Sequence, residues 1–184
     1  MKILIAAFFM FLIINDGFSQ QIPSYDSSKL SPLVLMVVNR LDTLSTDSLN
    51  QAFHDVSYQQ HHERDFDLLK KRGSETELLE LTNHSNPYIR INAFQGLLFR
   101  HFVSVENVLK NHLKDTGIVI LQSKDGGCIY TRMEIIDAMF HSVFEYKQYE
   151  KYTDNSFMDS EMLNRIFTLE EKYLKERKER KKSE

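Results

Sequence analysis

The sequence predicts an all-α protein with one small inserted β-hairpin, and three observations lead to this prediction. Helix-start signals recur along the chain, and each precedes apolar residues spaced at three and four. Between residues 118 and 131 this spacing changes, and two short β-prone runs flank a turn that contains two glycines. The composition of three prolines, six glycines and no tryptophan in 184 residues is compatible with a mostly helical protein.

Residues 1–19 have the pattern of a secretory signal peptide. Lys2 precedes an unbroken apolar run over residues 3–14, and Gly17 and Ser19 supply small residues before a cleavage site. The run is too short to span a bilayer, which needs about 20 apolar residues. We therefore expect cleavage near Ser19, a secreted or periplasmic protein, and no stable membrane insertion after cleavage.

The remaining chain is expected to contain a flexible polar arm over residues 20–30, one helical domain over residues 31–174, and a charged helical tail over residues 175–184. The net charge of −3 argues against a nucleic-acid or anionic-membrane partner. Cys128 is the only cysteine, so no disulfide within the chain can hold the fold. Stability must therefore come from packing.

The first helix is predicted from Pro32 to about Leu44, with Ser31 and Pro32 as its start signal. Its apolar residues cover much of the circumference, which favours a helix buried on more than one side. A short helix capped by Asp47 or Ser48 is expected next. A further helix over residues 61–72 ends at Gly73.

Two short antiparallel helices are predicted in the middle of the chain. Ser74 and Glu77 form a capping box that opens an apolar run containing three leucines. After a short turn, Asn86 is a favourable N-cap and Pro87 suits the first helical position. A third helix, starting at Ser104, is expected to extend to residue 113.

The predicted hairpin has strands at residues 118–121 and 128–131. Thr131 and Glu134 form another possible capping box, which predicts a helix starting there. The last helix should begin at Asp159 or Ser160, and its end should project into solvent, because residues 170–184 carry seven basic and five acidic side chains. Its apolar residues, spaced at three and four, are expected to be buried: Met162, Leu163, Ile166, Phe167, Tyr173 and Leu174.

Residues 77–98 resemble a HEAT repeat, the two-helix unit of one class of α-solenoid. The resemblance rests on Leu78, Leu79 and Leu81 in the first helix and on Pro87, Ile89, Arg90, Ala93 and Leu97 in the second. His84 stands where such repeats usually carry an acidic residue. Residues 104–145, with Asp115 at the acidic position, suggest a second unit, and residues 32–72 a third. The resemblance implies a short HEAT-like α-solenoid, in which Arg90 would seek an acidic partner such as Asp115.

A protein-binding surface is predicted on the helix that begins at Pro87. Tyr88, Asn92, Gln95 and Phe99 fall on one line of this helix, so that two amides lie between two aromatic rings. Such a mixture is typical of protein interfaces. Because the repeat is a binding scaffold and the sequence shows no convergent catalytic set, we expect an interaction module without catalysis, cofactor or metal. The alternative is that Tyr88 and Phe99 cover neighbouring helices. The same two interpretations, a contact patch or side chains that cover a helix, apply to Tyr146, Tyr149 and Tyr152.

An alternative function is a small metal-dependent hydrolase that uses the segment from His54 to Asp65. This segment also contains His61, His62 and Glu63, but its spacing matches no zinc signature, and a solvated polar face is the simpler interpretation. Cys128 could be a nucleophile, yet a small buried side chain in a strand is the simpler interpretation.

Overall fold

The structure is a computed structural model that describes residues 25–42, 56–122, 130–150 and 157–183. This part of the chain is mostly helical, with one antiparallel two-stranded hairpin, which confirms the predicted all-α fold with an inserted hairpin. In chain order the elements are η1 (Ser27–Lys29), α2 (Pro32–Asp42), α4 (Val56–Arg72), α5 (Glu75–Leu81), α6 (Pro87–Phe99), α7 (Val105–Asn111), β1 (Ile118–Gln122), β2 (Tyr130–Glu134), α8 (Ile135–Glu150) and α9 (Ser160–Ser183).

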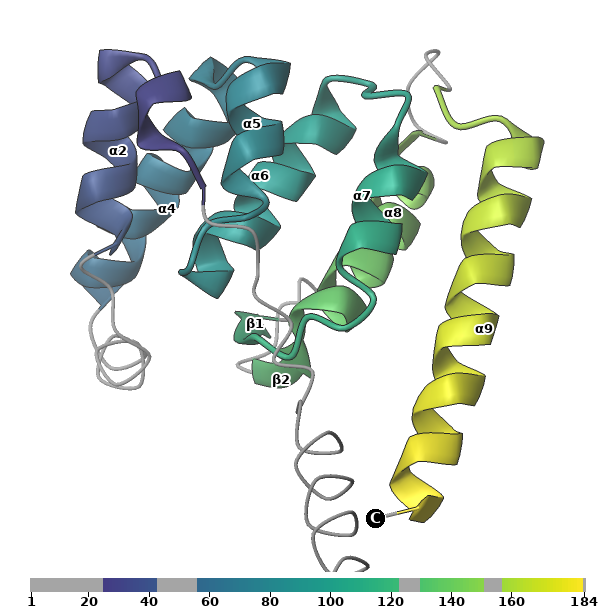
Figure 1. Cartoon of the computed structure of the whole chain (residues 1–184). Helices are drawn as coiled ribbons and strands as arrows, with labels where there is room; N and C mark the ends of the chain where they lie inside the picture. The colour runs from purple at the N-terminus through teal and green to yellow at the C-terminus, as the bar shows by residue number, and fades with distance from the viewer. Residues whose placement is uncertain (1–24, 43–55, 123–129, 151–156, 184) are drawn as a thin grey trace, which may run out of the picture.

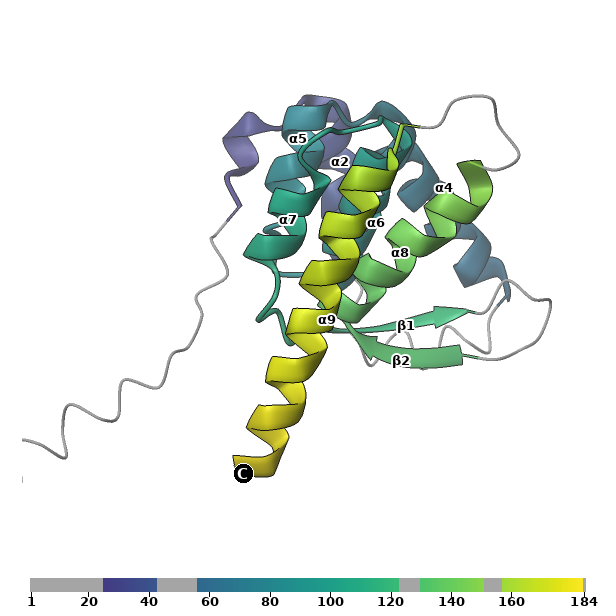
Figure 2. The same ribbon diagram turned by 90° about the vertical axis from the view of Figure 1, so that its right-hand side faces the viewer.

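The helices form two layers (Figure 1, Figure 2). Helices α4, α6 and α8 lie side by side in one layer, and α2, α5 and α7 pack against them in the other. Helix α9 closes one end of the stack beside α7 and α8. The hairpin contacts α6 and α8, and its register pairs Ile118 with Glu134 and Gln122 with Tyr130.

Helix α6 is the centre of the core because it contacts α4, α5 and α8 at once. Most of its side chains are buried, including Phe94 and Leu97. Gly96 allows this close packing, since a Cβ atom there would lie 3.0 Å from the side chain of Leu78. Gly73 has the same neighbour: its Cβ would lie 2.9 Å from Leu78. At both positions a side chain would have to displace Leu78, which shows how closely α4, α5 and α6 approach each other.

The predicted caps of α5 and α6 are confirmed. Ser74 and Glu77 form a complete capping box, and Asn86 accepts a hydrogen bond from the Tyr88 N–H at 2.9 Å with Pro87 in the first turn. Glu77 also reaches a second element, because its carboxylate accepts from the Ser31 N–H at 2.6 Å. One glutamate thus fixes the starts of both α5 and α2.

Residues 25–30, the described part of the expected flexible arm, are tied to α5. The Asp26 N–H donates to the Glu80 carboxylate at 2.7 Å, and Lys29 pairs with the same carboxylate at 2.8 Å. Asp26 itself caps η1 by accepting from the Ser28 N–H. These contacts depend on Glu80 of α5. The capping box at Ser74 and Glu77 fixes the start of this helix and therefore the position of Glu80.

Glu77 predicts a specific acid sensitivity. Burial alone would raise its pKa, but the hydrogen bonds from Ser31 and Ser74 lower the pKa from 4.5 to about 2. A depressed carboxyl pKa contributes stability that is full above about pH 4.5 and lost as pH falls towards 2. We expect Glu77→Gln to remove on the order of 2 kcal/mol at neutral pH and to flatten this acid transition. Thermal melts across this pH range check the expectation, with the exposed Glu75→Gln as the control that should match the wild type.

The predicted partnership of Arg90 and Asp115 is confirmed, and it is buried. The Arg90 Nε and Nη2 atoms each lie 3.0 Å from a different carboxylate oxygen of Asp115, and Nη1 donates to the backbone carbonyl groups of His84 and Ser85. His84 therefore contributes its main-chain oxygen to Arg90, while its ring Nδ1 accepts from the Asn86 N–H at 3.0 Å. Burial lowers the pKa of His84 and keeps the ring neutral, as this acceptor role requires.

The boundary between the hairpin and α8 differs from the prediction. Residues 130–134 are all in β2, so Thr131 pairs with Leu121 and is not a helix cap. Helix α8 begins at Ile135, whose N–H donates to the Gly117 carbonyl at 2.7 Å. Strand pairing therefore outweighs the local capping signal.

Helix α9 also differs from the prediction in two ways. Met162, Ile166 and Tyr173 are buried as expected, but Phe167 and Leu174 are exposed. The helix continues to Ser183, and Arg177 in the expected tail joins the fold through ion pairs of 2.7 Å with Glu134 and Asp137.

Candidate functional site

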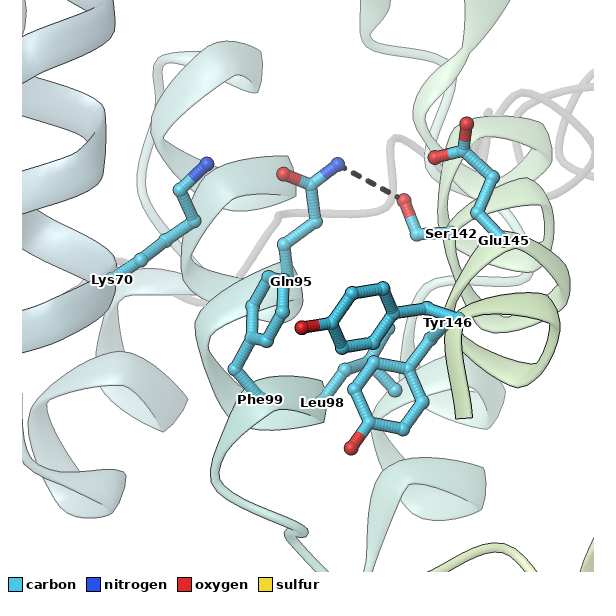
Figure 3. A pocket seen from close by; sticks show the side chains of 8 residues that line it. Lys70, Gln95, Leu98, Phe99, Ser142, Glu145 and Tyr146 are labelled. Atoms are coloured by element: carbon cyan, nitrogen blue, oxygen red, sulfur yellow. Dashed lines mark hydrogen bonds between the residues drawn. The ribbon is translucent and has the colours of Figure 1, made fainter. Parts of the chain in front are cut away.

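The candidate site is a pocket of about 220 Å³ between α4, α6 and α8. Lys70 enters it from α4, and side chains from α6 and α8 face it from the other two sides (Figure 3). Gln95 and Ser142 join α6 to α8 through a hydrogen bond of 3.2 Å. The full lining consists of Lys70, Gln95, Leu98, Phe99, Ser142, Glu145, Tyr146 and Tyr149.

Aromatic side chains form one side of the pocket. Phe99 and Tyr149 are 57% and 56% exposed, and their rings meet edge to face with centroids 6.4 Å apart. Tyr146 is buried beside them, with its ring centroid 5.8 Å from that of Phe99. Burial raises the pKa of Tyr146, so its phenol is neutral at physiological pH. The pocket therefore offers aromatic surface beside amide, hydroxyl and charged groups.

His101 follows α6, contacts the ring of Tyr146 and has an unusual backbone conformation. His101 has φ 59°, in the left-handed region that costs a residue with a side chain about 1–2 kcal/mol. It ends α6 in a Schellman arrangement, with the His101 N–H bonded to the Leu98 carbonyl and the Phe102 N–H bonded to the Leu97 carbonyl. The imidazole stacks on Phe157 at 5.2 Å with an interplanar angle of 10°. Strain of this kind is frequent at functional sites.

Glu150 accepts a hydrogen bond from the backbone of Phe157, whose ring contacts Tyr146. Its carboxylate accepts from the Phe157 N–H at 2.8 Å, while Lys147 donates to the Met158 carbonyl at 2.8 Å and to Glu150 at 3.0 Å. Burial opposes ionisation of Glu150, but these donors lower its pKa below the ordinary value. Hydrogen bonds therefore join the end of α8 to residues 157–158, next to the rings of Tyr146 and Phe157, whose centroids lie 6.2 Å apart.

The size and lining of the pocket limit the groups that it can accommodate. Small-molecule sites usually enclose roughly 300–1,000 Å³, so this pocket accommodates only a small group. Its polar groups are an amide, hydroxyls, a lysine and a glutamate. Gln95 and Ser142 bond to each other, and Glu145 lies 3.6 Å from His141 on the same helix. A pocket of this size beside exposed rings suits one side chain of a bound protein.

The structure brings together only two of the four predicted site residues. Gln95 and Phe99 line the pocket. Tyr88 is buried, and its hydroxyl accepts from the Ile120 N–H of β1 at 3.0 Å, so it belongs to the core under the hairpin. Asn92 donates to the Tyr88 carbonyl within α6 and does not line the pocket. For Tyr88, the alternative interpretation as a covering side chain is the correct one.

The other lining residues carry weaker sequence signals. The spacing of Tyr146 and Tyr149 indicates a possible contact patch, while Tyr152 lies outside the described residues. Ser142 is a lone small hydroxyl between buried apolar residues of α8, which is a usable signal for a polar contact. Lys70 and Glu145 are ordinary surface residues by pattern, and only the packing of α4 against α6 brings Lys70 to this pocket.

The residues of the alternative metal site do not assemble where the structure describes them. Asp65 is buried and pairs with Arg40 of α2. His54 and the side chain of His61 lie outside the description, as does Cys128. Among the described residues, no group of three or more histidine, cysteine, aspartate or glutamate side chains is placed to hold a metal ion.

Comparison with protein-family models, with curated proteins and with solved structures found no match to this chain. Of the helices in the described ranges, none combines the length and the apolar character needed to cross a membrane.

Proposed function

We propose that this chain is a HEAT-like protein-binding module, secreted or periplasmic after cleavage near Ser19, which binds a partner protein at the pocket between α4, α6 and α8. The proposal includes no catalytic step and no cofactor. Its partner-binding residues are Gln95, Phe99, Tyr146 and Tyr149, with Lys70 and Glu145 at the sides of the pocket.

One observation carries this proposal: the rings of Phe99 and Tyr149 are more than half exposed at the edge of the pocket between α4, α6 and α8. Exposed Phe99 and Tyr149 cost solvation free energy in the isolated chain, and aromatic side chains are enriched where proteins bind each other. The hydrogen bond between Gln95 and Ser142 joins α6 to α8 at the pocket, and Tyr146 packs edge to face against Phe157 with ring centroids 6.2 Å apart, so the pocket is formed without a partner. A preformed pocket lowers the ordering cost of binding.

Removing the two exposed rings is expected to abolish partner binding while the fold is kept. The double variant Phe99→Ala/Tyr149→Ala should lose at least about 2 kcal/mol of binding free energy, the range of interface hot spots. Its thermal midpoint should fall by only a few degrees, since both rings are largely exposed. The measurement is quantitative capture from the native envelope by tagged residues 20–184, followed by affinity determination with the captured protein.

The matched control is Leu79→Ala on α5, which removes a comparably accessible apolar side chain from the other layer. The proposal requires that this control binds like the wild type. Equal capture by the double variant and the wild type would show that the partner site lies elsewhere.

A further inference from the structure

A second group of exposed apolar side chains lies between α8 and α9. Phe144 is 51% exposed, and Phe167 and Leu174 are 41% and 40% exposed, although the spacing of the last two predicts burial. All three line a groove of about 410 Å³ between the two helices. Single exposed apolar residues are ordinary, but several in one hollow are typical of an interaction surface.

The apolar side of α9 continues into lysines. Phe167, Leu174, Lys178 and Lys181 are separated by seven, four and three residues, so they lie along one side of the helix. Lys178 and Lys181 are exposed. The end of α9 that carries them extends past α8 and the hairpin (Figure 2). The groove and the two lysines are therefore neighbouring parts of one surface.

The charges of this surface are separated along its length. Residues 177–182 contain five basic side chains and one acidic side chain, in a chain whose net charge is −3. Inside the groove the lining includes the carboxylates of Asp137 and Glu170. Arg177 neutralises Asp137 through an ion pair of 2.7 Å, so the lysines beyond it are the cationic part of the surface.

This distribution defines the kind of ligand that the surface can bind. Carboxylates of a ligand would be repelled inside the groove by Glu170 and attracted at Lys178 and Lys181. Apolar side chains of the ligand would pack against Phe144, Phe167 and Leu174. The complementary ligand has apolar side chains in one part and acidic side chains immediately after them.

We infer that the α8–α9 groove and the lysines beyond it bind an amphipathic segment of a partner protein whose apolar residues are followed by acidic residues. The hollow shape and the Glu170 carboxylate in the groove distinguish this ligand from a flat anionic membrane, which Glu170 would repel. The surface shares no lining residue with the pocket between α4, α6 and α8, so the inference does not depend on that pocket.

The test uses a labelled synthetic helical peptide with leucine and phenylalanine on one face and a glutamate-rich end. Fluorescence anisotropy measures its binding to the chain of residues 20–184. We expect binding that weakens as salt is raised, and a loss of about tenfold or more for Lys178→Glu/Lys181→Glu. The matched control is Arg64→Glu/Lys71→Glu, which changes the net charge equally at exposed positions of α4, outside the α8–α9 groove, and it should change affinity by less than about twofold.

Several outcomes would overturn the inference. These are failure of the peptide to bind, equal binding of a peptide with lysines in place of the glutamates, and equal losses in both double variants. Binding to phosphatidylglycerol vesicles without binding to the peptide would assign the surface to a membrane instead.

Discussion

Replacing Arg90 with alanine is expected to lower the free energy of unfolding by about 3–5 kcal/mol, because it leaves a buried carboxylate without its cation. The Arg90 side chain is 1% exposed and forms two contacts of 3.0 Å with Asp115. Burial disfavours the charge on Asp115, yet the hydrogen bond from His112 and the charge of Arg90 keep its pKa below 3.8. Without Arg90, the donors to the Asp115 carboxylate within the described part of the chain are His112 and the Gly117 N–H.

Thermal and urea unfolding of Arg90→Ala measure this effect. A loss of this size should lower the midpoint by about 10 °C in a domain of this length. The control is Arg165→Ala, which breaks exposed pairs with Glu106 and Glu161 at 2.9 Å each and should leave the midpoint close to that of the wild type. An unchanged midpoint for Arg90→Ala would show that α6, α7 and β1 are not held together by this pair.

Gly117→Ala is expected to have the second largest effect, about 2–4 kcal/mol, although it adds only a methyl group. A Cβ atom at residue 117 would lie 2.1 Å from the Arg90 Nη2, so the guanidinium must leave Asp115. Gly117 is therefore the residue that gives the ion pair its space.

A double-mutant cycle separates this cause from a general backbone effect. In the Arg90→Ala background the clashing atoms are absent, and the nearest remaining contact of the new methyl group is Asp115 Oδ1 at 3.1 Å. Gly117→Ala should then cost less than about 1 kcal/mol more, which gives a strong non-additive coupling. Additive effects of the two substitutions would rule out the proposed clash.

The sequence alone predicts the parts of this fold that depend on local signals. The capping box at Ser74 and Glu77 and the Asn86 cap with Pro87 are encoded within a few residues, and all are present. The partnership of Arg90 and Asp115 follows from no local signal, and only the resemblance to a HEAT repeat predicts it.

Where long-range packing decides, the prediction is wrong or silent. The capping pattern at Thr131 and Glu134 is overridden by strand pairing with β1. Phe167 has the spacing of a buried residue, but the groove between α8 and α9 leaves it exposed. Tyr88 and Phe99 are equivalent by pattern, yet the hairpin covers Tyr88 and nothing in the described residues covers Phe99 to the same extent. The side of α6 that faces a neighbour depends on how the layers assemble, which a single helical period cannot specify.

The most direct test of the account is photocrosslinking from the proposed pocket in the native envelope. A photoreactive residue at position 99 should crosslink to one partner protein, and the same group at position 79 on α5 should not. Competition by excess wild-type chain should remove the crosslinked species, and substitution of Tyr149 by alanine should weaken it. A partner that crosslinks from position 79 but not from position 99 would contradict binding at the pocket between α4, α6 and α8.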